Sequence, residues 1–221
     1  MLDRNHWMEV LKGVKAGHAP EAAGAVTASI EEANELFTHE IFRNGSKVLD
    51  VGSGNGRQAI GLLQYDLAEY VGIESMKACV EFSQNAFSQY PTHKFIWIDV
   101  RNEGSNPKGT IDAFDFRIPF EDGHFDAVIA GSLFTHLSTK EVCAHYLAEM
   151  HRVLKEDGRL FSSWFGNPPN ELSSSPERTA LPESTIINMI CRHFEIYHTR
   201  GGISSGYHDQ WCIFSRRVSR P

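Results

Sequence analysis

The amino-acid sequence predicts an α/β fold: a mostly parallel sheet with helices on both faces and an antiparallel last strand. Two observations predict this class. Short apolar runs alternate with amphipathic helical segments between residues 46 and 166, a pattern typical of βαβ units. Two further apolar runs near the C-terminus are joined only by a glycine-rich turn over residues 201–206. A linker this short cannot hold a helical crossover, so these two strands must pair antiparallel.

The individual elements follow from the spacing of apolar residues. Between residues 22 and 41 apolar side chains recur every three or four positions, with Glu31, Glu32 and Glu35 on the opposite face of the predicted helix. Further helices are predicted over residues 57–65, 76–90, 139–154 and 184–191. Strands are predicted over residues 47–51, 70–73, 94–99, 125–130, 159–165, 194–199 and 210–216. Trp97 alternates with Phe95 in the third strand and is expected in the core.

Composition and charge describe an ordinary acidic domain. The 221 residues include 21 Lys and Arg and 28 Asp and Glu, which gives a net charge of −7 with neutral histidines. This balance argues against a protein that binds nucleic acid or an anionic membrane by neutralising phosphates. We expect one domain over residues 1–221, in which a helical cap (1–45) and a substrate-side segment (167–221) flank a cofactor-binding core (46–166).

The cysteines and the start of the chain give no sign of export. Four cysteines lie far apart without the spacing of a zinc site, so we expect reduced thiols. The chain begins without the apolar run of a signal peptide and holds no stretch of ~18 apolar residues. We therefore expect a soluble, cytoplasmic protein without membrane contact.

The sharpest local signal is the glycine-rich segment Val48-Leu-Asp-Val-Gly-Ser-Gly-Asn-Gly56 between a strand and a helix. Glycines there allow tight turns and leave backbone amides open to a ligand. Glu74 closes the next strand, 22 residues after Gly52, where a carboxylate can accept hydrogen bonds from both ribose hydroxyls. Ligands of open α/β sheets bind at the carboxyl ends of the strands. At that edge we expect Asp50, Glu74, Asp99 and residues 130–132.

The charges around this segment favour one nucleoside ligand over another. The dinucleotide pattern G-x-G-x-x-G needs a small residue where this chain has Arg57. Asp50 would repel a pyrophosphate, but it suits an ammonium and a sulfonium. The loop amides can still hold a single carboxylate. S-adenosylmethionine carries all of these groups, so the pattern favours it over NAD.

Several segments in the proper order resemble successive motifs of class I S-adenosylmethionine-dependent methyltransferases. They are VLDVGSGNG, YVGIE, IPFEDGHFDAVIAGSLFTHL and YLAEMHRVLKEDGRLFSSWF, and together they run from about residue 46 to residue 166. The resemblance implies a Rossmann-like sheet of seven strands, of which the last is antiparallel. It also implies S-adenosylmethionine as the cofactor and S-adenosylhomocysteine as the product.

The resemblance assigns cofactor contacts residue by residue. Gly52, Gly54 and Gly56 would line the methionine end, and Glu74 would bind the ribose. The expected cofactor contacts further include Asp50, Ser53, Ser75, Met76, Asp99, Phe114 and Ser132. Ser75 and Met76 would flank the adenine. The adenine amino group has two candidate partners, because an insertion over residues 102–114 separates Asp99 from the segment Ala113-Phe114-Asp115, which can supply the contact instead.

His136 is the candidate catalytic residue. It follows the fourth strand and can take a proton from a substrate hydroxyl as the methyl group arrives. The alternative is that it caps or packs against the helix that starts near residue 139. Methyl transfer can also proceed by holding a nucleophilic atom in line with the sulfonium, without any acid or base. His208, Asp209, His6 and Trp7 are further groups that can reach the substrate face.

Two other patterns are set aside. Asn167-Pro-Pro-Asn170 resembles the N-P-P-aromatic motif of amino-group methyltransferases, but it follows the fifth strand and lacks the aromatic residue. Gly131-Ser132 stands where a metal-dependent enzyme would place acidic ligands, so we expect no catalytic metal.

We therefore expect O-methylation of a small-molecule or glycan acceptor by a monomer or homodimer. The alternatives are N-methylation of a small amine, a nicotinamide-dependent oxidoreductase and a non-catalytic binding protein of the same fold.

Overall fold

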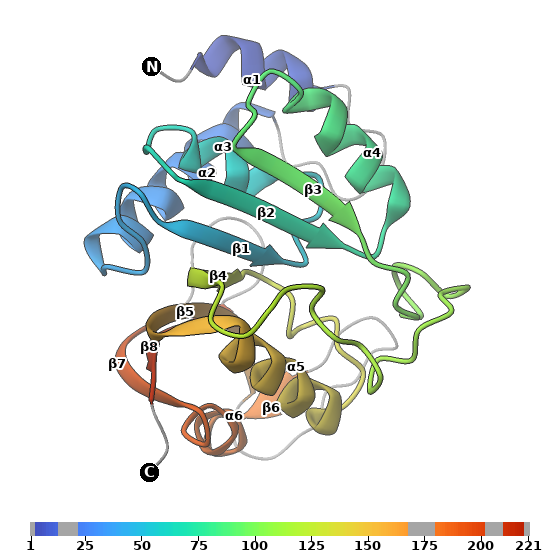
Figure 1. Cartoon of the computed structure of the whole chain (residues 1–221), viewed down its shortest axis with the longest axis vertical. Helices are drawn as coiled ribbons and strands as arrows, with labels where there is room; N and C mark the ends of the chain where they lie inside the picture. The colour runs from blue at the N-terminus through green and yellow to red at the C-terminus, as the bar shows by residue number, and fades with distance from the viewer. Residues whose placement is uncertain (1–2, 13–21, 168–179, 202–209, 219–221) are drawn as a thin grey trace.

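A computed structural model describes residues 3–12, 22–167, 180–201 and 210–218 of the chain, and it confirms the predicted α/β class (Figure 1). The strands are β1 (Lys47–Val51), β2 (Glu69–Glu74), β3 (His93–Trp97), β4 (Phe125–Ala130), β5 (Leu154–Asn167), β6 (Ala180–Pro182), β7 (Phe194–Arg200) and β8 (Gln210–Arg217). The helices are α1 (Arg4–Lys12), α2 (Ala22–Thr38), α3 (Arg57–Leu62), α4 (Lys77–Ala86), α5 (Lys140–Val153) and α6 (Glu183–Ile190).

The strands form one sheet in the order β3-β2-β1-β4-β5-β8-β7. Neighbours from β3 to β5 are parallel, whereas β8 is antiparallel to both β5 and β7. The predicted antiparallel strand is therefore confirmed. The prediction of seven strands is wrong by one, because β6 pairs parallel with residues 165–167 at the far end of β5. Its three residues adjoin a proline- and serine-rich segment and are too few to show an alternating pattern.

Helices cover both faces of the sheet (Figure 1). The helices α1 to α4 lie on one face, and α5 and α6 lie on the other. Each face has its own apolar cluster: Trp7, Leu36, Ile60 and Phe161 belong to the first, and Val128, Met150 and Ile190 belong to the second. None of the helices in the described part of the chain is long and apolar enough to cross a membrane.

The strand order reverses between β1 and β4. From β1 the chain proceeds outward through β2 to β3, and then returns to place β4 on the other side of β1. At such a switch point the loops after the two central strands diverge to opposite faces and leave a crevice at the carboxyl ends. Here those loops begin at Gly52 and Gly131, so the topology places a ligand between them.

One residue of α2, Glu32, was predicted on the wrong face of the helix. Glu32 is buried rather than solvated, with 7% of its surface exposed. Its carboxylate accepts hydrogen bonds from Arg57 Nη1 at 2.9 Å and Gln58 Nε2 at 2.8 Å. The reason is that α2 packs directly over the start of α3, so the acid faces the two polar residues that follow the glycine loop.

Candidate functional site

The loop over residues 52–56 owes its shape to three left-handed glycines. Gly52, Gly54 and Gly56 have φ values of 78°, 53° and 78°, which residues other than glycine rarely adopt. A Cβ on Gly56 would come within 2.9 Å of the Phe87 ring, and one on Gly52 within 3.0 Å of Leu133. A Cβ on Gly54 would meet nothing within 4 Å. Gly54 therefore borders open space where a ligand can approach the backbone.

Glu74 ends β2 beside this loop and is 7% exposed. Its Oε2 accepts a hydrogen bond from the Gly54 amide at 2.9 Å, and its Oε1 accepts one from the Met76 amide at 2.7 Å. The Ser75 hydroxyl is a weaker partner of Oε1 at 3.2 Å and also lies 2.8 Å from the Ser105 hydroxyl. The carboxylate thus links the loop after β1 to the loop after β2.

This donor and acceptor set fits a ribose. A carboxylate has about four lone-pair sites, two on each oxygen. The Gly54 and Met76 amides occupy one site on each oxygen, so one site on each stays open when the Ser75 hydroxyl bonds to Ser105 instead. Two adjacent hydroxyls can donate to those sites, while Gly54 leaves space for the group attached to the sugar. A nucleoside with a short flexible substituent therefore matches what Glu74 and the loop present.

Asp50 lies beneath the loop rather than on its surface, with 1% exposed. It accepts a hydrogen bond from the Tyr70 hydroxyl at 2.6 Å. Burial raises the pKa of Asp50 to about 7, although the Tyr70 bond and the Arg57 charge act in the opposite direction. A cation bound near the loop would favour the charged form of this carboxyl.

Ser53 is also buried, at 8% exposure. Its hydroxyl has no hydrogen-bond partner within the described residues. It lies against Gly72 of β2, under the loop.

After β3, the insertion over residues 102–114 binds the side chain of Asp99. Asn106 Nδ2 donates to one of its carboxylate oxygens at 3.0 Å and the Thr110 hydroxyl to the other at 2.6 Å. These hydrogen bonds lower the pKa of Asp99. Asp99 thus anchors the insertion that follows it, whereas Phe114 presents an aromatic ring with 53% of its surface exposed.

The segment after β4 brings together Ser132 and three residues that the sequence did not single out. Ser132 contacts Ser163 of β5 and Gln210 of β8, and the carbonyl of His136 accepts a hydrogen bond from Asn102 Nδ2 at 2.9 Å. His136 itself is exposed. In the sequence, the pair Ser162-Ser163 inside an apolar strand was the one signal for these contacts, since buried polar residues need hydrogen-bond partners.

Several expected participants cannot be placed at the site. His208, Asp209 and residues 168–170 of the Asn-Pro-Pro-Asn motif lie outside the described residues. His6 is exposed on α1, and Trp7 is fully buried between α1 and the sheet with its ring 4.5 Å from that of Phe87. Neither of these two N-terminal residues has a recorded contact with the loop after β4.

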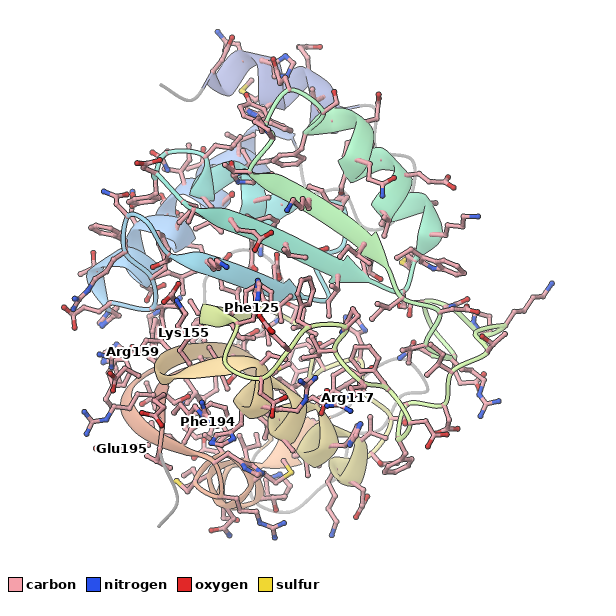
Figure 2. All side chains as sticks on the ribbon, viewed as in Figure 1. Arg117, Phe125, Lys155, Arg159, Phe194 and Glu195 are labelled. Carbon is pink, nitrogen blue, oxygen red and sulfur yellow. The ribbon has the colours of Figure 1, made fainter. Side chains whose placement is uncertain are left out.

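The described residues hold no group of three or more His, Cys, Asp or Glu side chains that can bind a metal ion. Figure 2 shows Lys155 and Arg159 at the edge of the molecule opposite to the carboxyl ends of β1 and β2. Each pairs with an acid, Lys155 with Asp126 at 2.6 Å and Arg159 with Glu40 at 3.9 Å. These cations therefore lie away from the site.

Comparison with known proteins places this geometry in a family. The methyltransferase domain family matches residues 49–162. The ubiquinone/menaquinone biosynthesis C-methyltransferase UbiE of Geotalea uraniireducens is 30% identical over 129 residues, which are 58% of this chain and 48% of that protein. The chain thus spans about half the length of this relative.

Two solved structures share the fold. The [4+2]-cyclase SpnF has a TM-score of 0.68 at 16% identity, covering 100% of this chain and 94% of its own. The 1,6-didemethyltoxoflavin-N1-methyltransferase of Burkholderia thailandensis, solved with S-adenosylhomocysteine, has a TM-score of 0.64 at 16% identity, covering 93% and 94%.

The family match covers more than half of the chain and includes β1, the glycine loop, Glu74 and the segment after β4. The chain belongs to the class I S-adenosylmethionine-dependent methyltransferases.

Proposed function

We propose that the chain uses S-adenosylmethionine to methylate a hydroxyl-bearing small molecule, with the hydroxyl oxygen as the acceptor atom. The observation that carries the proposal is the buried Glu74 carboxylate, which joins the glycine loop to the end of β2 while Gly54 faces open space. Sugar hydroxyls belong to the same acceptor class.

Each part of the cofactor has a chemical counterpart at this edge. Glu74 accepts hydrogen bonds from the two ribose hydroxyls, and the methionine end lies against the glycine loop beside Gly54, where the backbone borders open space. From beneath the loop, the carboxylate of Asp50 stabilises the positive charges of the ammonium and the sulfonium. Ser75 and Met76 flank the adenine, and Phe114 covers it. When bound, S-adenosylmethionine supplies an electrophilic methyl group.

His136 is the proposed base. It is exposed at the end of the segment that starts at Ser132, and it can take the proton of the acceptor hydroxyl. In a phenol or hydroquinone, the loss of this proton makes both the oxygen and a ring carbon nucleophilic. Methylation of a ring carbon is therefore the second candidate, and the name of the UbiE relative favours it.

The cofactor assignment is tested by ligand-induced stabilisation. S-adenosylhomocysteine at ~100 times its Kd should add about 2.7 kcal/mol to the free energy of unfolding. The Glu74→Ala variant should lose most of this gain, while the Glu81→Ala variant, in which an exposed acid of α4 is removed, should keep it. Stabilisation by NAD but not by S-adenosylhomocysteine would contradict the assignment.

The acceptor atom is tested with S-adenosylmethionine that carries a ¹³C methyl group. Phenols, hydroquinones, sugars and small amines serve as acceptors, and the ¹³C shift of the product separates O-, C- and N-methyl groups. O-methyl products whose formation falls in the His136→Ala variant support the proposal. A ring-methyl product would favour the second candidate, and an N-methyl product would contradict both.

Three expectations stay proposals alongside this one. They are that residues 1–221 form a single domain, that the protein is a monomer or homodimer, and that it works in the cytoplasm on acceptors other than nucleic acid.

A further inference from the structure

Ser132 has an unusual backbone conformation at the carboxyl end of β4. Its φ of 59° lies in the left-handed region, which among the described non-glycine residues it shares with Glu40. Such a conformation is strained for a residue that has a side chain, and it persists only where neighbours enforce it. Strained residues of this kind cluster at ligand sites, so the neighbours of Ser132 point to what it does.

A closed ring of hydrogen bonds holds Ser132. Its amide donates to Ser163 Oγ at 2.7 Å, and the Ser163 hydroxyl donates to Gln210 Oε1 at 2.6 Å. Gln210 Nε2 then donates to Ser132 Oγ at 3.0 Å. We call Ser132, Ser163 and Gln210 the polar ring. In this arrangement Oε1 of Gln210 faces Ser163 and Nε2 faces Ser132.

The polar ring retains donors for a ligand. A primary amide has two N–H groups, and Ser132 uses one of those on Gln210. The Ser132 hydroxyl lies 3.2 Å from Gln210 Oε1, a long contact that a better acceptor can replace. Ser163 is 3% exposed, whereas Ser132 and Gln210 are both partly exposed. The ring therefore has a buried base and two polar groups at the surface.

The polar ring adjoins the cofactor loop. Leu133 packs against Gly52, where a Cβ would lie 3.0 Å from its side chain. Gln58 of α3 packs against Gly131, where a Cβ would lie 2.2 Å from Nε2. The segment over residues 131–133 thus separates the glycine loop on one side from Ser163 and Gln210 on the other. A molecule that receives a methyl group from the cofactor has to enter next to this segment.

We infer that Ser132 and Gln210 recognise a neutral oxygen function of the methyl acceptor, a carbonyl or a hydroxyl, and so determine its specificity. The inference rests on the proposed function. None of the three ring side chains is charged, and among the described residues they hydrogen-bond to one another. Two neutral donors satisfy a carbonyl or hydroxyl oxygen well, but they do not offset the desolvation of a carboxylate or phosphate.

Two variants separate the ligand role from folding. Ser132→Gly removes the hydroxyl and relieves the backbone strain, so the protein should melt no lower than the wild type. Gln210→Ala removes the amide donors. The matched control is Gln89→Ala, in which an exposed glutamine beyond α4 is removed. Gln210→Ala and Gln89→Ala should bind S-adenosylhomocysteine like the wild type.

The probes are three phenols that differ in one group: 4-hydroxybenzamide, methyl 4-hydroxybenzoate and 4-hydroxybenzoate. Binding to protein saturated with S-adenosylhomocysteine is followed by NMR, including the side-chain amide signals of Gln210. The two neutral phenols should shift those signals and bind at least ~5-fold more tightly than the carboxylate. Ser132→Gly and Gln210→Ala should each weaken their binding by about tenfold, as expected for a lost hydrogen bond.

The inference is overturned if the carboxylate binds best, if no neutral phenol shifts the Gln210 signals, or if both variants bind the phenols like the wild type. Intact S-adenosylhomocysteine binding in these cases would leave the proposed function standing. Failure of the wild type to bind S-adenosylhomocysteine would instead overturn the proposed function.

Discussion

Asp50, the last residue but one of β1, lies inside the protein, where its carboxyl accepts a hydrogen bond from the Tyr70 hydroxyl at 2.6 Å. Burial raises the pKa of Asp50 from 3.8 to about 7. The charges of Glu32 and Glu74 act in the same direction, and that of Arg57 opposes them. The folded protein therefore binds this proton more tightly than the unfolded chain does, which couples the stability of the ligand-free protein to pH.

The sign of the coupling follows from the two pKa values. The stabilisation is complete below pH ~4 and is lost as the pH rises through about 7, because the unfolded chain releases the proton first. A shift of roughly 3 pKa units corresponds to on the order of 4 kcal/mol. We expect Asp50→Asn, a neutral side chain of the same shape, to flatten the pH dependence of the free energy of unfolding in this interval.

Urea unfolding of the ligand-free protein at several pH values measures this effect. The control is Asp157→Asn, which changes an exposed carboxyl and should leave the profile of the wild type intact. Parallel profiles for Asp50→Asn and the wild type would show that Asp50 does not carry the coupling.

At the scale of elements, the contact between α2 and α3 holds the end of the glycine loop in place, where α3 begins. The Ser29 hydroxyl donates to the carbonyl of Arg57 at 2.5 Å and accepts from the Gly61 amide at 2.7 Å. A Cβ on Gly61 would lie 2.1 Å from the Ser29 carbonyl oxygen. The two helices can approach this closely only because residue 61 has no side chain.

Gly61→Ala should therefore destabilise the protein even though alanine favours helices. Overpacking of this kind costs about 1–3 kcal/mol, and here the obstacle is backbone rather than a mobile side chain. Gly24→Ala in α2 is the matched control, because its Cβ would meet nothing within 4 Å. That change should stabilise the protein by about 0.5–1 kcal/mol. Thermal or urea unfolding of both variants checks the two signs, and equal effects would refute the packing argument.

The elements show which parts of the fold the sequence can predict. The core strands and helices were predicted within a few residues, because their apolar periodicity and glycine turns are local signals. The burial of Glu32 was not predictable, since it depends on where α2 lies relative to α3. Trp97 was expected in the core but is 40% exposed, and its indole N–H donates to the Ser75 carbonyl at 2.9 Å. It ends β3, where its ring lies 5.5 Å from the amine of Lys77, the first residue of α4, at the rim of the covered region.

The candidate site likewise contains contacts that the sequence predicts and contacts that it does not. Motif residues such as Glu74 and Gly54 meet across neighbouring loops because parallel strands end at one edge. Ser163 lies beside Ser132 through the parallel pairing of β4 with β5. Gln210 reaches Ser132 through the antiparallel pairing of β5 with β8, a contact over 78 residues that no local pattern contains. Their meeting depends on the assembled sheet.

At the scale of the whole molecule, the insertion between β3 and β4 connects parts of the site that are far apart in the chain. Ser105 reaches Ser75 after β2, and Asn102 reaches the His136 carbonyl after β4. Arg152 of α5 fixes the exit of the segment by donating to the carbonyls of Ile118 and Phe120. Figure 1 shows this segment along the carboxyl ends of the strands. It therefore spans the edge at which we place the adenine.

This arrangement predicts that the insertion retains the cofactor. The Asn102→Ala/Ser105→Ala variant should release S-adenosylhomocysteine faster, because the segment loses its contacts on both sides of the site. Losing the two hydrogen bonds to Ser75 and to the His136 carbonyl, at about 0.5–1.5 kcal/mol each, corresponds to roughly 5-fold to 150-fold in the dissociation rate, with the lower end expected for contacts near solvent. Thermal stability without ligand should change little, since both side chains lie near the surface.

Stopped-flow displacement measures the rate, with the exposed neighbour Glu103→Gln as the control. A dissociation rate equal to that of the control would mean that the insertion does not close over the cofactor, and the adenine would then depend on Ser75 and Met76 alone.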